Sequence, residues 1–258
     1  MILRRVTQHV RDQNWTAIGI DLVIVVLGVF LGIQIGNWNE ERKNEVLAVD
    51  YMERLQADLL DEIANWNYTS EYYEATRTHS LAALAGFEQS VEELDDQFLI
   101  DLYQASQVLN TSVRKGTYDE LLATGRIVYI TDDRTRRLLT NHYSRSEART
   151  QTQNQQADYR QVLREQMDHR VQRAIREHCD DVYSVDENNF TIISLPDDCS
   201  FDLAQSLWQN DIRTLHESRI VKQALRFQLS TLDSRLSSMR SAIVTAENML
   251  SELSKNNG

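Results

Sequence analysis

Residues that could ligate a metal or attack a substrate are few in this sequence, and their spacing matches no site of that kind. The six histidines include no HExxH pair, and two cysteines alone are too few for a four-ligand zinc site. His169, His178 and Cys179 share one region and could form a metal site, although histidines on a helix surface are the commoner case. No glycine-rich phosphate loop and no serine nucleophile elbow occurs. The sequence therefore predicts no catalytic, cofactor-binding or metal-binding residue, and no enzyme.

The two cysteines lie on either side of a segment with the pattern of a β-hairpin. Residues 182–185 (VYSV) and 190–195 (FTIISL) have the composition of strands, and 186–189 (DENN) that of the turn between them. We therefore expect Cys179 and Cys199 to form a disulfide across the open ends of this hairpin insert. Closing a loop of about 21 residues would contribute about 3 kcal/mol. The alternative is a pair of free, buried thiols.

Two other groups of side chains are interpreted as structural. Four aspartates at the base of the hairpin could attract calcium, but they lack the ordered ligand spacing of a calcium loop, which favours a solvated acidic tip. Four aromatic residues close together on one helix are expected to pack in a core, with a ligand groove as the alternative. The aspartates are Asp180, Asp181, Asp197 and Asp198, and the aromatic residues are Trp66, Tyr68, Tyr72 and Tyr73.

One carboxyl group, that of Asp21, falls within the longest apolar stretch of the chain. The stretch covers 17–36, and twenty helical residues rise about 30 Å, the thickness of the hydrocarbon core of a bilayer. Trp15 and Trp38 bracket it as aromatic anchors at the two membrane interfaces. We therefore predict a transmembrane helix. The alternative is a buried helix of a soluble protein, because the uninterrupted apolar core, 22–33, is short.

Small residues follow one face of this predicted span. Gly28, Gly32 and Gly36 stand four apart, and Asp21 falls on the same face. Such glycines let two helices approach closely in lipid, so we expect a membrane-protein partner or a second copy of the chain to pack there. The alternative is chance, because glycine is common in membrane helices. Asp21 itself could handle protons or ions, contact a partner helix, or reach the water of the headgroup layer.

Charged residues on either side of the span orient it. Three arginines precede it and two basic residues follow it closely, so the positive-inside rule places 1–16 in the cytoplasm and 37–258 outside it. A net charge of −12 argues against a nucleic-acid partner. Within the tail, one helical face is apolar, which predicts an interfacial helix on anionic lipid, with a disordered tail as the alternative. The residues of this face are Ile2, Leu3, Val6 and Val10.

The outer segment, 37–258, is expected to be all-α apart from the hairpin, because one proline and eight glycines are too few for turn-rich folds. Apolar residues at three-four spacing predict a helix that leaves the membrane directly and breaks near Gly86. Further helices are expected over 95–109, 117–124 and 131–178, the last capped by Thr131.

The clearest apolar pattern is in the last predicted helix, 225–253. Its apolar residues step by four and three, which indicates a coiled-coil seam or bundle packing. The partner of this seam is either the stripe 52–66 of the same chain or another subunit. The predicted seam comprises Leu225, Leu229, Leu232, Leu236, Met239, Ile243, Ala246, Leu250 and Leu253.

Two segments carry a resemblance to a known family. Gly19-Ile-Asp21 with 34–43 (QIGNWNEERK), and 117–127 (TYDELLATGRI), resemble sequence boxes of uncharacterised bacterial single-pass membrane proteins, which form a domain of unknown function. Members carry an acid where Asp21 stands and an NNWNE box, in which Gly36 replaces the first Asn. The resemblance implies a location in the bacterial envelope and no activity. Together with the orientation expected from the flanking charges, it predicts an anchor in the inner membrane and an outer domain in the periplasm.

These observations favour an interaction or scaffold protein, held in the bilayer by one helix, as a subunit of a membrane complex or a homo-oligomer. The rival interpretation is a stator-like, ion-driven subunit that uses Asp21, because stator subunits share the layout of a short tail, one span with an early Asp, and a periplasmic domain. A sensor or an enzyme has less support from the residues.

Overall fold

The computed structural model describes residues 15–155, 158–187 and 190–255. The chain is all-α apart from a two-stranded antiparallel hairpin, as predicted. The strands pair Val182 with Ser194 and Val185 with Thr191. In chain order the elements are α2 (Trp15–Gly86), η1 (Val91–Glu93), α3 (Asp96–Gln104), α4 (Gly116–Ala123), η2 (Arg126–Tyr129), α5 (Asp133–Gln153), α6 (Asp158–Gln166), α7 (His169–His178), β1 (Val182–Val185), β2 (Thr191–Ser194), α8 (Gln205–His216) and α9 (Arg219–Lys255).

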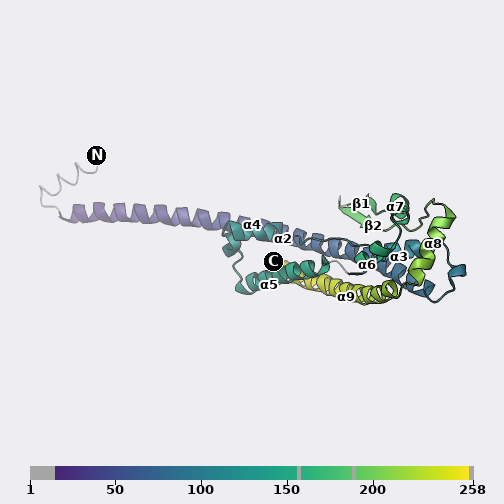
Figure 1. Cartoon of the computed structure of the whole chain (residues 1–258). Helices are drawn as coiled ribbons and strands as arrows, with labels where there is room; N and C mark the ends of the chain where they lie inside the picture. Colours follow the sequence, from purple (N-terminus) through teal and green to yellow (C-terminus); the bar gives the residue numbers. More distant parts are fainter. Residues whose placement is uncertain (1–14, 156–157, 188–189, 256–258) are drawn as a thin grey trace.

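Helix α2 runs without interruption for 72 residues and has two different surroundings. Its first half projects alone from the rest of the molecule, with its side chains exposed or at most half-buried through Asp50 (Figure 1). From Tyr51, which is 1% exposed, the same helix is packed against other elements. One helix therefore forms both the predicted span and the spine of the folded domain.

Helix α9 lies antiparallel to the packed half of α2. Near the end closest to the predicted span, Met52 and Leu55 share a buried cluster with Met249 and Leu253. At the far end, Ala83 shares another cluster with Leu225. The predicted seam of α9 thus packs on α2 of the same chain, which answers the question that the sequence left open. A third cluster between these two joins Trp66, Tyr72 and Tyr73 of α2 to Leu232, Leu236, Met239 and Ala242 of α9.

The buried face of α9 is rotated from the predicted one. Six of the nine seam residues are buried as expected, and three are only half-buried: the buried ones are Leu225, Leu232, Leu236, Met239, Ala246 and Leu253, and the half-buried ones are Leu229, Ile243 and Leu250. Four neighbouring positions outside the predicted seam are buried as well, namely Gln228, Arg235, Ala242 and Met249. The two polar residues can lie inside because each has a partner: Gln228 Nε2 donates to the Ala105 carbonyl at 3.1 Å, and Arg235 Nη1 to the Tyr73 hydroxyl at 3.0 Å.

The predicted helix 131–178 is wrong, because the structure divides it into α5, α6 and α7. Asn154 ends α5, and its side chain exchanges two hydrogen bonds with the backbone of Thr111. Asp168 caps α7 by accepting from the N–H of Arg170 at 2.8 Å. Short polar side chains that bind the backbone in this way compete with a continuing helix. The cap of α5 is likewise Asp132 rather than Thr131, since the Asp132 carboxylate accepts from the N–H of Thr135.

Other boundaries differ less. Helix α3 ends at Gln104 rather than 109, because the Ser106 hydroxyl donates to the Tyr103 carbonyl just after the helix. Helix α2 ends at Gly86, near the expected break, and Gly86 is needed there: an added Cβ would lie 2.5 Å from Cδ2 of Phe98. Helix α8 and the first turns of α9 were not predicted.

Candidate functional site

The predicted span, 17–36, lies in the half of α2 that does not pack against other elements. Within the described residues, one helix is both long enough and apolar enough to cross a membrane, and that helix is α2. None of its most apolar 18-residue stretch is buried by the described chain. The predicted anchors, Trp15 and Trp38, are 75% and 64% exposed. The tail residues expected to form an interfacial helix, Ile2, Leu3, Val6 and Val10, lie outside the described residues.

The glycine face of the span is open. A Cβ added at Gly28, Gly32 or Gly36 would meet no atom within 4 Å. Asp21 lies half-buried in the same helix, and within the described part of the chain its carboxylate makes no hydrogen bond or ion pair. The described part of the chain thus supplies no partner for this face.

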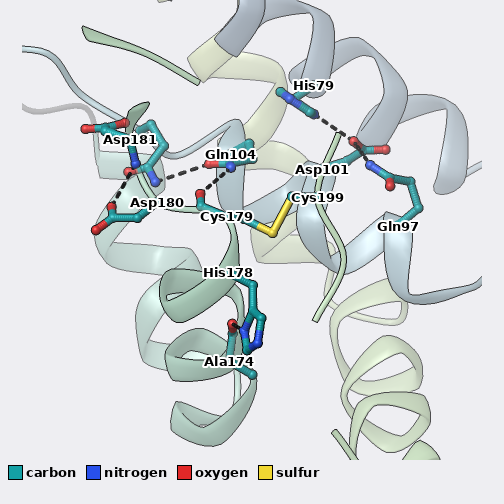
Figure 2. The surroundings of a disulfide bond; sticks show 11 residues. His79, Gln97, Asp101, Gln104, Ala174, His178, Cys179, Asp180, Asp181 and Cys199 are labelled. Carbon is teal, nitrogen blue, oxygen red and sulfur yellow. Dashed lines mark hydrogen bonds and ion pairs between the residues drawn. A yellow bond between two sulfur atoms is a disulfide. The ribbon is translucent and has the colours of Figure 1, made fainter. Parts of the chain in front are cut away.

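The predicted disulfide is present. Cys179, which is fully buried, is bonded to Cys199 with their Cα atoms 5.4 Å apart, and no cysteine is left free (Figure 2). The bond excludes the alternative metal site, because the Cys179 sulfur is already used. Of the two histidines considered with it, His178 directs Nδ1 at the Ala174 carbonyl, 2.9 Å away, and His169 is exposed on the first turn of α7.

Of the aromatic cluster on α2, Trp66, Tyr72 and Tyr73 pack in the core, Tyr68 is half-buried, and two of the tyrosines bind the hairpin, one at its base and one at its turn. The Tyr72 hydroxyl donates to Asp181 at 3.0 Å, and the Tyr68 hydroxyl to Asp186 at 2.6 Å. Burial raises the pKa of the Tyr72 hydroxyl, and the Asp181 carboxylate raises it further. No group of three or more His, Cys, Asp or Glu placed to hold a metal occurs among the described residues, so the aspartates at the hairpin base form no calcium cage.

A buried polar centre that the sequence did not predict lies between α2 and α5. The carboxylate of Glu62, with a side chain 2% exposed, is 2.8 Å from Nε2 of His142. It also accepts hydrogen bonds from the Ser146 hydroxyl at 2.6 Å and from the Trp66 indole N–H at 3.3 Å. Burial alone would raise the pKa of Glu62, but these hydrogen bonds and the attraction of His142 outweigh it, so the pKa lies below its ordinary value.

Helical spacing builds this centre. Glu62 and Trp66 are one turn apart on α2, and His142 and Ser146 are one turn apart on α5, so four side chains meet across one interface. The sequence offered little signal for it, because Ile63 continues the apolar spacing between Leu59 and Trp66 and Glu62 stands beside it as an ordinary charged residue.

The polar centre does not have the geometry of a catalytic triad. In a triad the serine donates to the histidine and the histidine to the acid, whereas here Ser146 and His142 both contact the carboxylate of Glu62. Ser146 is 1% exposed. The arrangement therefore fixes α5 against α2 and presents no nucleophile to a substrate.

Comparisons with known proteins give one match. No curated protein and no solved structure shows a significant match to the chain. A model described as "Family of unknown function (DUF6090)" matches residues 21–166. The match begins at Asp21, includes most of the span as well as Glu62 and His142, and ends at the last residue of α6. Because it covers more than half of the chain, the protein belongs to this family of unknown function, DUF6090.

Proposed function

We propose that this protein is a membrane-anchored scaffold, with one helix in the bacterial inner membrane and a helical domain in the periplasm that belongs to a membrane complex. The observation that carries the proposal is the continuity of α2, which is exposed across the apolar span and packed along one face from Tyr51 onward. Because the helix passes unbroken from the lipid into the folded core, it holds the folded domain at a fixed distance and orientation relative to the span.

A stalk separates the two parts. Between Gly36 and Tyr51 the side chains of α2 are exposed or half-buried, and this stretch of helix is about 21 Å long. Val46 and Val49 are 66% and 53% exposed on it. They follow Gly32 and Gly28 by whole heptads, so one face is continuous from span to stalk. This continuity favours a second copy, held parallel by the same membrane, as the partner.

The proposed compartment rests on charge and on the disulfide. Disulfides persist in the periplasm and are rare in the cytoplasm. The arginines before the span favour a cytoplasmic start of the chain. Alkaline phosphatase fused after Gly258 should therefore be active, and green fluorescent protein fused at the same place should be dark. The reverse pair of results would place the domain in the cytoplasm.

The scaffold role is tested by shortening the stalk. Deleting 40–46 removes one heptad, which is about two helical turns. The folded domain therefore keeps its rotational orientation relative to the span but lies about 10 Å closer to it. The deleted chain should still fold, because the removed side chains are outside the buried clusters. Complexes purified in mild detergent with the full chain should be lost with the shortened one. A full chain that purifies as a monomer with no associated protein would contradict the scaffold role.

A second function, that of a stator-like subunit, is favoured by the position of Asp21. Its carboxylate lies within the span and has no partner in the described chain. Such carboxylates often handle protons or ions. Asp21→Asn would separate the two functions. A stator subunit with this change should assemble normally but lose its ion-driven activity, whereas a scaffold should keep both its assembly and its function.

A further inference from the structure

A groove of about 360 Å³ lies between α5 and α9, on the outer side of the buried polar centre. His142, whose ring contacts Glu62, forms part of its floor. Arg134, Arg145 and Arg149 line it from α5, and Met249 and Glu252 from α9. The volume falls within the range of small-molecule sites.

The charge of this groove is opposite to that of the chain. The protein has a net charge of −12, yet three of the four fully charged residues that line the groove are arginines. The fourth, Glu252, lies 3.4 Å from Arg134 and 3.7 Å from Lys255, so it is already neutralised. The groove is therefore a local basic site on an acidic molecule.

Two of its arginines have unused donors. Within the described residues, the guanidinium groups of Arg145 and Arg149 make no hydrogen bond or ion pair. Arg149 is half-buried, and this burial lowers its pKa, partly offset by the attraction of Glu62 behind it. Glu62 does not occupy the guanidinium donors, because its oxygens accept from Ser146 and Trp66 and face His142. A half-buried cation with unpaired N–H groups favours an oxygen acceptor from outside.

We propose that this groove binds a soluble ligand through a phosphate or carboxylate group, with Arg145 and Arg149 as the two guanidinium forks. The aliphatic side chains of Leu138 and Met249 line the same groove and suit an apolar part of the ligand. The headgroups of the chain's own bilayer are a remote source for Arg149, because about 39 Å of helix separates Gly36 from Glu62, which lies behind it.

The test uses the full chain in phosphatidylcholine nanodiscs at low salt, titrated calorimetrically with pyrophosphate and with citrate. Arg145→Gln should weaken binding by about tenfold or more, because a charge-assisted bidentate contact is lost. Arg137→Gln, an exposed arginine of α5 outside the groove, should change the dissociation constant less than about twofold. Arg145 is itself exposed, so its replacement should leave thermal unfolding unchanged.

Three outcomes would overturn the proposal. The first is no saturable binding of either anion up to 10 mM. The second is equal weakening by Arg145→Gln and Arg137→Gln, which would indicate general charge attraction. The third is full competition by nanodiscs that contain phosphatidylglycerol, which would identify a lipid headgroup rather than a soluble anion as the ligand.

Discussion

Two buried carboxyl groups show how partners decide the ionisation of a side chain. Glu62 and Asp211 are 2% and 4% exposed. Glu62 is in contact with three side-chain groups, and its pKa is lowered despite burial. Asp211 accepts from the backbone N–H of Asp168 and lies near the Asp168 carboxylate, so burial dominates and raises its pKa to about 6. The number of hydrogen-bond donors near each carboxylate thus decides whether its pKa is lowered or raised, although the two residues are similarly buried.

Asp211 should make stability fall as the pH rises. Between its ordinary pKa of 3.8 and about 6 the folded chain holds a proton that the unfolded chain releases, so raising the pH through this window destabilises the fold. Asp211→Asn keeps an acceptor for the Asp168 N–H and removes the charge. The variant should be more stable than wild type by about 1–2 kcal/mol at pH 7.5, with the gain shrinking toward zero near pH 4. Thermal unfolding followed by circular dichroism measures this, and a gain independent of pH would contradict it.

Glu62→Gln should have the opposite pH dependence. Because the folded-state pKa is lowered, the stability from the Glu62 carboxylate is fully present above 4.5 and is lost as the pH falls through the folded value. We expect the variant to lose about 1–3 kcal/mol at pH 7 and less at pH 3.5. Glu53→Gln, an exposed change on the same helix, is the control and should lie within about 0.5 kcal/mol of wild type. Equal losses in the two variants would show that the buried centre does not stabilise the fold.

At the scale of elements, the sequence predicted what depends on long apolar periodicity. The continuity of α2 and the presence of α9 were visible in this way, whereas the hairpin was visible in its strand-like composition and its turn. The sequence did not predict correctly which face of α9 is buried. The pattern of apolar residues placed Leu229 and Ile243 inside and left Gln228 and Arg235 outside. Polar residues enter a core when tertiary partners satisfy them, and these partners, Ala105 and Tyr73, are distant in sequence.

The break after α5 and the Glu62 centre escaped prediction for the same physical reason. Asn154 ends a helix by binding Thr111, and Glu62 is buried because His142 lies across from it. Both facts depend on contacts between elements, whereas the Cys179–Cys199 bond was predictable because it spans one local hairpin.

The disulfide is an element-scale staple with a measurable contribution. It closes a separation of 20 residues around β1 and β2, and its loss should cost about 3 kcal/mol on the loop-entropy model. Protein taken from its membrane and alkylated without reductant should show no free thiol by intact mass. Reductant should then lower the thermal midpoint, and the Cys179→Ala/Cys199→Ala variant should not respond to it. Two alkylated thiols before reduction would show that the bond does not form in the cell.

At the scale of the whole molecule, the two halves of α2 have opposite surroundings. The packed half is covered by α9 and the smaller helices, whereas the apolar span is covered by nothing in the described chain and the stalk is exposed or half-buried (Figure 1). The seam of α9 is occupied by α2, so it does not need another subunit. The open face of the span and stalk is therefore where the proposed association should be sought.

Replacing Gly32, the middle glycine of the open face, tests that association. Helices in lipid associate by close packing without a hydrophobic driving force, so one bulky side chain at the contact holds them apart. Gly32→Ile should weaken self-association of the full chain in vesicles by roughly tenfold or more, measured by energy transfer between labelled copies. The fold itself should not change, because a Cβ at Gly32 meets nothing within 4 Å. Leu31→Ile, off the glycine face, should associate like wild type. If Gly32→Ile also associates like wild type, the glycines are not a contact between copies, and the open face serves a different membrane protein or the lipid alone.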